Sequence, residues 1–370
     1  MIKRTRLAIG LILGLFTILI PLQAQDSYTE DYEIEFDDWV SSAQLMLPDD
    51  SGDDFPVVIL VHGSGPYDMN ATSFDSSLDS TEPISENFLL IAEYLAENGY
   101  ASLRYNKRGV RALDDYDWEA VQASTLDVLI DDAGAVIDFA QTLDAVDSDN
   151  IFLYGWSEGA WVVSNITTMR DDIAGLILQG APQGSLADVL PYQYQEIALD
   201  YLRDVVDSDE DGLLSLDDIA DVPMGSTQLM LPFFFYDPSS SPDNPIVNQF
   251  VDQNGDDLID IDEELVPMIS MYLSNIGGFL PPVDASYDTG ALVAEATIPT
   301  LLLHGVNDGW VSVENAETIA EVSPDNTTLI TYPELGHALS VTEILAEDGF
   351  YPMDAESLTD LVAWLDTVNR

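Results

Sequence analysis

Unbroken apolar runs alternate with amphipathic stretches along most of the chain, which predicts a sheet covered by helices. The run FPVVILVHGSG (55–65) is rich in β-branched residues and ends in glycines, as is typical of a strand buried on both faces. The stretch ISENFLLIAEYLAENG (84–99) has helical spacing and stops at Asn-Gly. We therefore expect an α/β fold, with a mostly parallel central sheet and helices on both faces. Further strands are predicted at 32–36, 43–48, 100–105, 150–155, 173–180, 298–305 and 326–333, and further helices at 124–144, 157–170, 313–321 and 354–369.

Residues 186–285 depart from this alternation. They contain only predicted helices, acidic loops and the Pro/Ser-rich segment YDPSSSPDNP (236–245). We interpret this stretch as a mainly helical cap inserted into one domain. Residues 26–185 and 286–370 would then form the two parts of the core.

The first 25 residues have the three parts of a secretory signal peptide. Basic residues precede the apolar stretch 7–20, and PLQAQ offers a cleavage site near Ala24. A retained membrane anchor is the alternative, but the apolar stretch has about 14 residues and a membrane span needs roughly 20. We expect residues 1–25 to be removed and the protein to be secreted or periplasmic. The chain contains no cysteine, so no disulfide stabilises it.

The charge balance is strongly acidic, with 68 Asp and Glu residues against 10 Lys and Arg residues. Such a surface repels nucleic acid and anionic membranes and disfavours anionic substrates. Disorder is excluded by the 46% content of hydrophobic residues and the evenly spread apolar runs. We expect a folded, halophilic protein that loses its fold at low ionic strength, because 1 M salt screens charges beyond roughly 3 Å.

A serine lies between two glycines in the segment GWSEG (155–159). A Gly-x-Ser-x-Gly motif alone is weak evidence, but this one joins a predicted strand to a predicted helix, as a nucleophile elbow requires. Gly155 and Gly159 lack a Cβ and allow the strand and the helix to approach each other. We expect Ser157 to be a nucleophile on a sharp turn, with the helix N-terminus beside it.

A serine needs a base, and the chain has only three histidines. His62 and His304 end buried strands, so we expect them to order their own loops. His337 follows the last strand in a loop, where a base reaches the serine, and Asp308 follows the preceding strand. The order Ser157, Asp308, His337 is that of an α/β-hydrolase catalytic triad.

An oxyanion hole needs two backbone N–H groups. The residue after the nucleophile supplies one, which is the amide of Glu158. The loop after the strand at 55–61 supplies the other, and the Ser64 amide is the best candidate.

Several motifs together resemble a known family. The segments HGSGPYD, LRYNKRG, GWSEG, HGVND and LGH are similar to those of secreted and periplasmic esterase-like α/β-hydrolases related to the serine aminopeptidases, in which three of them run HGSGPxDRD, RYDKRG and GHSEGG. The resemblance covers roughly residues 30–185 and 290–370. It implies an α/β-hydrolase fold and carboxylester hydrolysis, with peptidases and thioesterases as relatives.

This chain departs from the family motifs at three places. Met69 and Asn70 replace an Arg-Asp pair, Asn106 replaces an Asp, and Trp156 replaces the His before the nucleophile. The first two changes affect the ordering of loops at the mouth of the site, and the third affects the acyl pocket. None of them affects the triad.

Two features leave alternatives open. The basic cluster Arg104, Lys107, Arg108 and Arg111 either binds a substrate carboxylate or neutralises nearby acids and ties down a loop. The aromatic run Phe233, Phe234 and Phe235 either lines an acyl pocket or packs the cap on the core.

Two segments of the cap have the ligand spacing of EF-hand calcium loops. The ligands predicted in the first, DSDEDGLLSLDD (207–218), are Asp207, Asp209, Asp211, the Leu213 carbonyl, Ser215 through water, and Asp218. The ligands predicted in the second, DQNGDDLIDIDE (252–263), are Asp252, Asn254, Asp256, the Leu258 carbonyl, Asp260 and Glu263. Leu214 and Ile259 occupy the same loop position, where paired loops form a short β contact. We expect two structural Ca²⁺ ions bound weakly, on the order of 10⁻⁴ to 10⁻³ M, although a chain this acidic also produces such patterns by chance.

These expectations combine into one hypothesis, an exported serine hydrolase with a calcium-stabilised cap, acting on a small, neutral and partly apolar ester. A peptidase acting on short peptides is the alternative within enzymes. A calcium-dependent binding protein on a hydrolase scaffold is the alternative outside them. No organic cofactor is expected, and neither nucleic acid nor a stable membrane insertion is expected as a partner.

Overall fold

The computed structural model describes residues 27–49, 51, 54–74, 82–223, 225–241, 244–279 and 287–369. The predicted signal peptide therefore lies outside the described residues. Within them, no helix combines the length and the apolar character that crossing a bilayer requires.

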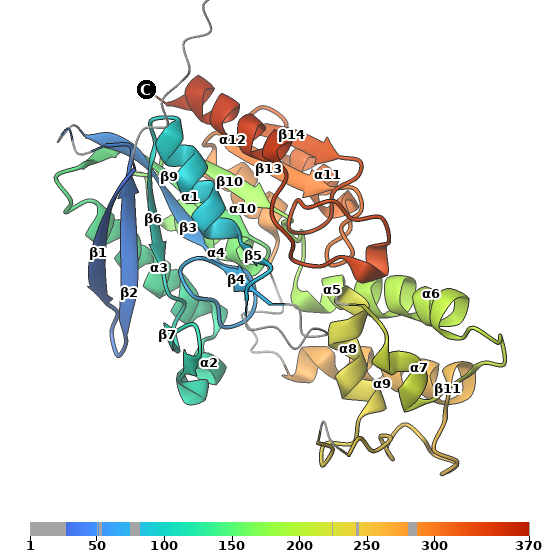
Figure 1. Cartoon of the computed structure of the whole chain (residues 1–370). Coiled ribbons are helices and arrows are strands. Elements are labelled where there is room, and N and C mark those ends of the chain that lie inside the picture. Colours follow the sequence, from blue (N-terminus) through green and yellow to red (C-terminus); the bar gives the residue numbers. More distant parts are fainter. Residues whose placement is uncertain are drawn as a thin grey trace, which may run out of the picture.

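The centre of the molecule is an eight-stranded, mostly parallel sheet, as predicted (Figure 1). Its six inner and C-terminal strands run parallel, while β2 pairs antiparallel with β6 and β1 pairs antiparallel with β2 at one edge. In spatial order the strands are β1 (Tyr28–Glu35), β2 (Val40–Leu47), β6 (Ala101–Tyr105), β3 (Phe55–Val61), β9 (Val146–Trp156), β10 (Gly175–Gln179), β13 (Thr300–Gly305) and β14 (Thr327–Tyr332).

Helices cover both faces of this sheet. The alternation along β3 explains why its sequence is apolar throughout: Val57 and Ile59 belong to one buried cluster, and Val58 and Leu60 belong to the other. The first cluster lies under α3 (Leu126–Ala140), α4 (Glu158–Met169), α10 (Thr289–Ala296) and α11 (Glu314–Val322). The second cluster lies under α1 (Asn87–Glu97) and α12 (Ala355–Val368).

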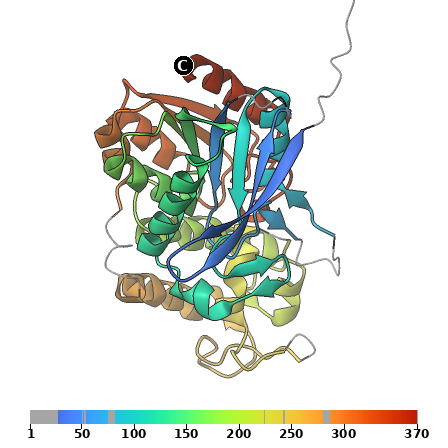
Figure 2. The same ribbon diagram turned by 90° about the vertical axis from the view of Figure 1, so that its left-hand side faces the viewer.

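The cap lies at one end of the sheet in both views (Figures 1 and 2). Its first part is a nearly continuous helical segment that runs from 186 to 206. The cap elements are α5 (Leu186–Pro191), π-helical turns at Tyr192–Ala198 and Leu202–Val206, α6 (Leu199–Tyr201), β11 (Leu213–Leu214), α7 (Leu216–Ala220), α8 (Ser226–Phe235), β12 (Ile259–Asp260), a π-helical turn at Ile261–Leu265, and α9 (Val266–Phe279).

The remaining elements are short. They are the strand pairs β4 (Thr72–Ser73) with β5 (Ser85–Glu86) and β7 (Val110–Ala112) with β8 (Asp115–Tyr116), the helix α2 (Trp118–Ala123), and a 3₁₀ turn at Leu345–Glu347.

The cap has its own apolar core, and the aromatic run belongs to it. Phe234 and Phe235 are buried in this core, whereas the side chain of Phe233 is 73% exposed. None of the three lines the cavity beside Ser157. An acyl pocket built from these phenylalanines is therefore wrong, because α8 turns two of them into the cap and the third to solvent.

The basic cluster forms internal pairs instead of a free cationic patch. Arg108 binds Asp132 and Asp38, and two of its nitrogens contact the Asp132 carboxylate at 2.5 and 2.8 Å. Arg111 binds Asp117 at 2.5 Å. The buried guanidinium of Arg104 donates to Asn70 and Gln44. The cluster therefore ties down its loop.

Candidate active site

Ser157 occupies a sharp turn between a strand and a helix. β9 ends at Trp156 and α4 begins at Glu158, and Ser157 between them has φ 55° and ψ −117°. A positive φ is unusual for a residue with a side chain and costs about 1–3 kcal/mol. The backbone N–H of Ser157 donates to the carbonyl of Gln179 at 2.9 Å, which holds the turn against β10.

Two glycines make this turn possible. A Cβ on Gly155 would lie 2.5 Å from the Gly159 carbonyl oxygen, and a Cβ on Gly159 would overlap the carbonyl oxygen of Val61. The first turn of α4 therefore lies directly against the end of β3. This contact explains why the motif has glycine at both positions.

The structure brings the predicted acid and base together. Asp308 follows β13 and is fully buried, and its Oδ2 lies 2.7 Å from Nδ1 of His337. Its other oxygen, Oδ1, accepts the backbone N–H groups of Trp310 and Val311, each at 2.8 Å. With Nδ1 facing Asp308, the Nε2 of His337 is the nitrogen left for the serine.

The two groups shift each other's pKa. Burial alone would raise the pKa of the Asp308 carboxyl, but His337 and the hydrogen bonds from His304 and His337 hold it well below its usual range. Burial alone would lower the pKa of His337, but the charge and hydrogen bond of Asp308, assisted by Asp348, raise it above 6.5. The pair therefore favours a carboxylate beside a readily protonated imidazole.

His304 does more than order its own loop. Its Nε2 lies 2.9 Å from the Val311 carbonyl and 3.2 Å from Asp308 Oδ2. The Asp308 oxygen that faces His337 therefore also faces a second buried imidazole. In the sequence, the contact between His304 and Asp308 is indicated only by the position of His304 at the end of β13, four residues before Asp308.

The predicted oxyanion residues come from two sides of the site, since Ser64 follows β3 and Glu158 begins α4. Ser64 and Glu158 line the same cavity as Ser157. Glu158 is the first residue of α4, where backbone N–H groups have no acceptor within the helix. Lys107 connects the two sides, because its Nζ donates to the Gly63 carbonyl at 2.7 Å and to the Glu158 carboxylate at 2.6 Å.

Ser157 and His337 open into one cavity of about 360 Å³. Aromatic rings form much of its wall, including Trp156, which stands where the related family has a histidine. Among its described lining residues there is no lysine or arginine. The aromatic lining residues are Tyr67, Trp156, Trp161, Trp310 and Phe350.

The first helical segment of the cap reaches both the cavity and the acid loop. Leu186 and Val189 line the cavity. The hydroxyl of Tyr192 donates to the Asp308 carbonyl at 2.8 Å, and the amide of Gln193 donates to the Trp310 carbonyl at 2.8 Å. The motif pattern missed these two residues, since nothing in a cap sequence marks which side chains turn toward the core.

The first calcium-type loop gathers three carboxylates. Ligand oxygens of Asp207, Asp209 and Asp211 lie within 4.8 Å of one another. Asp207 Oδ2 accepts the N–H of Gly212 at 2.8 Å. Asp218 lies outside this group: it caps α7, where its Oδ2 accepts the N–H and the hydroxyl of Ser215. The predicted ligand Ser215 is therefore hydrogen-bonded to the predicted ligand Asp218. Leu213, whose carbonyl is another predicted ligand, is the first residue of β11.

The second loop repeats this backbone pattern. Asp252 is buried, and its Oδ2 accepts the N–H of Asp257 at 3.1 Å. Asp257 has φ 64°, the left-handed conformation that its place in the loop predicts. Asn254 and Asp256 accept the N–H groups two residues ahead, of Asp256 and Leu258. Leu214 pairs with Ile259 between the loops, as predicted.

The last carboxylates of the second loop differ in burial and in hydrogen bonding. Asp260 caps the following turn, and the Glu263 side chain is exposed. Glu264 is buried instead and accepts the N–H groups of Gln253 at 2.9 Å and Asp260 at 3.0 Å. The π-helical turn at Ile261–Leu265 accounts for this, because its wider winding adds one residue. Counting along a regular loop could not locate Glu264.

Comparison with known proteins agrees with this fold. The model of the alpha/beta hydrolase family matches residues 58–345. The chain belongs to the alpha/beta hydrolase family. Esterase EstD of Thermotoga maritima is 30% identical over 153 residues, which span 40% of this chain and only 32% of EstD.

Solved structures show the same hydrolase fold at low sequence identity. An esterase of Pyrococcus furiosus is 13% identical, with a TM-score of 0.52 and 96% of each chain covered. The acylaminoacyl peptidase of Pyrococcus horikoshii is 12% identical, with a TM-score of 0.51, 93% of this chain and 42% of that chain covered.

The glycine contact at the elbow leads to a stability prediction. Gly159→Ala should lower the free energy of unfolding by about 1–3 kcal/mol, because the methyl group forces α4 away from the Val61 carbonyl. Gly134→Ala in α3 is the matched control: it meets no atom within 4 Å and should stabilise the protein by about 0.5–1 kcal/mol. Urea unfolding measures both, and equal stability of the two variants would contradict the contact.

Proposed function

We propose that this alpha/beta hydrolase is an exported serine esterase that cleaves small, uncharged carboxylic esters through an acyl-enzyme. One observation carries the proposal: Ser157, on its elbow, and His337, bonded to Asp308, lie in the wall of the same cavity. The likeness to EstD, whose name describes an esterase, supports esters over peptides.

In the proposed reaction, His337 Nε2 takes the proton of Ser157 Oγ while this oxygen attacks the ester carbonyl carbon. The N–H groups of Ser64 and Glu158 hold the resulting oxyanion. The bond to the alcohol oxygen then breaks, and the proton passes from His337 to that oxygen. A water molecule next gives a proton to His337 and attacks the acyl carbon, and the bond from that carbon to Ser157 Oγ breaks to release the acid, while His337 returns the proton to Ser157 Oγ.

Cavity size and charge support this choice of substrate. A volume of about 360 Å³ is at the small end of ligand pockets and disfavours long acyl chains. Trp310 and Phe350 stack with ring centroids 5.0 Å apart, which provides a flat apolar wall. The net charge of −58 and the absence of cationic side chains among the described lining residues disfavour an anionic ester.

Replacement of two serines separates the proposed roles. Ser157→Ala should abolish labelling by a fluorophosphonate probe and lower kcat/KM for a p-nitrophenyl ester by at least about 10⁴-fold, since the attacking oxygen is lost. Ser64→Ala should keep most of the activity, because only its backbone N–H is used. Labelling that persists in Ser157→Ala would contradict the proposed nucleophile.

The pKa of His337 predicts the pH dependence. Only the neutral imidazole accepts the serine proton, so kcat/KM should fall as pH falls through the pKa of His337. Because Asp308 and Asp348 raise that pKa, the midpoint should lie above 6.5, the ordinary value. A pH profile of p-nitrophenyl ester hydrolysis measures it, and a midpoint at or below 6.5 would refute this assignment.

We propose further that the two cap loops bind Ca²⁺ in a structural role. Oxygen ligands and left-handed turn residues at matching positions support this, as does the β pairing between the loops. The proposed ligands of the first site are Asp207, Asp209, Asp211 and the Leu213 carbonyl. Those of the second are Asp252, Asn254, Asp256, the Leu258 carbonyl and Glu264.

Removal of calcium tests this proposal. Excess EDTA should lower Tm by about 5 °C or more, since an ion that binds only the folded state stabilises it. The double variant Asp207→Asn, Asp252→Asn should have a low Tm that no longer responds to EDTA or Ca²⁺. Asp149→Asn, an exposed position on the core, should respond like the original protein. A Tm indifferent to both EDTA and Ca²⁺ would end the proposal.

A further inference from the structure

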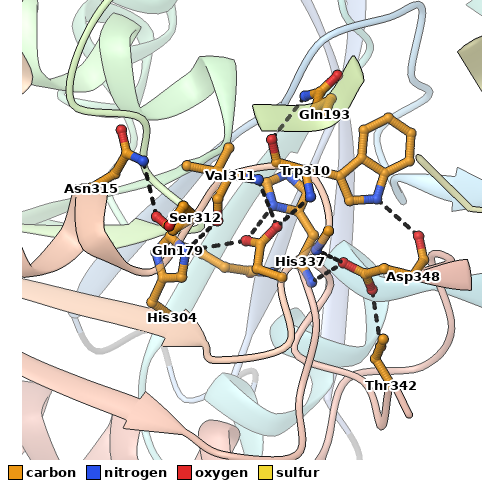
Figure 3. A network of polar contacts seen from close by, with 12 residues as sticks. Gln179, Gln193, His304, Trp310, Val311, Ser312, Asn315, His337, Thr342 and Asp348 are labelled. Carbon is orange, nitrogen blue, oxygen red and sulfur yellow. Dashed lines mark hydrogen bonds and ion pairs between the residues drawn. The ribbon is translucent and has the colours of Figure 1, made fainter. Parts of the chain in front are cut away.

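Asp348 lies between the cap and the two loops that carry Asp308 and His337. Its side chain is fully buried just after the turn Leu345–Glu347. Oδ2 accepts the backbone N–H of Gly309 at 2.9 Å. It also accepts that of His337 at 2.8 Å (Figure 3). A single carboxylate oxygen therefore holds the backbone of both loops.

The surrounding residues are built around this carboxylate. Oδ1 accepts the hydroxyl of Thr342 at 3.0 Å, and the indole of Trp310 donates to the Asp348 carbonyl at 2.9 Å. A Cβ on Gly336 would overlap Oδ1. The residue before His337 must therefore be glycine for the base loop to reach Asp348.

The same segment is attached to the cap. Ala346 is buried in the apolar core of the cap. The carboxylate of Glu347 accepts the hydroxyl of Tyr201 at 2.6 Å, and Tyr192 donates to the Asp308 carbonyl. Cap and catalytic loops thus meet at residues 345–348.

We propose that Asp348 is a positioning residue that holds His337 against Asp308 and adds negative charge beside the imidazole. This role rests on the proposed serine esterase function. The charge favours the imidazolium that forms when Ser157 gives up its proton. The hydrogen bonds set the distance between the two loops.

The electrostatic surroundings agree with such a role. The titratable groups that face Asp348 are Asp308 and His337 in the two loops and Tyr192 on the cap. Burial, with the charge of Asp308, raises the pKa of Asp348 to about 7, while His337 and the two N–H groups oppose this rise. The pKa of His337 is raised by Asp308 first and by Asp348 in addition.

Two replacements of Asp348 separate the effect of its hydrogen bonds on the position of the loops from the effect of its charge. Asp348→Asn keeps a carbonyl oxygen for the two N–H groups, and its NH₂ group can donate to Thr342 Oγ1. Asp348→Ala removes acceptor and charge together. Glu347→Gln is the matched control, because the neighbouring carboxylate contacts Tyr201 of the cap and neither catalytic loop.

Ester hydrolysis across pH is the first measurement. Asp348→Ala should lower kcat by about tenfold or more with little change in KM, since the base is misplaced. Asp348→Asn should restore most of kcat and move the acidic limb of kcat/KM to lower pH, since the charge of Asp348 no longer raises the pKa of His337. Glu347→Gln should leave both unchanged. An Asp348→Ala variant with unchanged kcat, or an Asp348→Asn profile that overlays the original, would overturn the proposal.

An NMR titration separates this proposal from the esterase proposal. The chain has three histidines, so the imidazole signals of His337 can be assigned with a His337→Asn variant. The pKa of His337 should fall in Asp348→Asn whether or not the protein hydrolyses esters. An unchanged pKa would refute the role of Asp348, whereas a missing fluorophosphonate label on the original protein would refute only the esterase function.

Discussion

The close contact between the start of α4 and the end of β3 is the constraint on which the site depends. Gly155 and Gly159 allow that contact, and it forces Ser157 into a left-handed conformation at the carboxyl end of the sheet. Ser64, in the loop after β3, and Glu158, at the start of α4, line the same cavity. One packing interaction of backbone atoms thus sets the positions of Ser157 and of the first amide of α4.

The polar groups of the base and acid loops are arranged around two buried carboxylates. Asp308 faces two imidazoles and two backbone N–H groups, while Asp348 faces two N–H groups and a hydroxyl. Their environments push their pKa values in opposite directions, although both are fully buried. Two causes make the difference: the charge of His337 and the hydrogen bonds of both imidazoles lower the pKa of Asp308, whereas the charge of Asp308 adds to burial in raising that of Asp348.

Sequence patterns predicted the sheet well, because unbroken apolar runs such as that of β3 have few other structural solutions, and the loops predicted to carry Asp308 and His337 do meet in the structure. They failed where tertiary packing or local winding decided the outcome. The π-helical turn at Ile261–Leu265 was not predicted, and within it Glu264 accepts the N–H of Gln253. Asp348 follows an ordinary acidic turn, and its importance arises only because two loops distant in sequence converge on it.

The cap explains how an acidic insertion can matter to chemistry in the core. Its first helical segment carries cavity residues and the hydroxyl of Tyr192, and it leads directly into the loop that begins at Asp207. Any ion that draws together the carboxylates of this loop also fixes the end of that segment, since their mutual repulsion otherwise favours its fraying. The loop that carries Asp308 is therefore connected to the cap through Tyr192 and through residues 345–348.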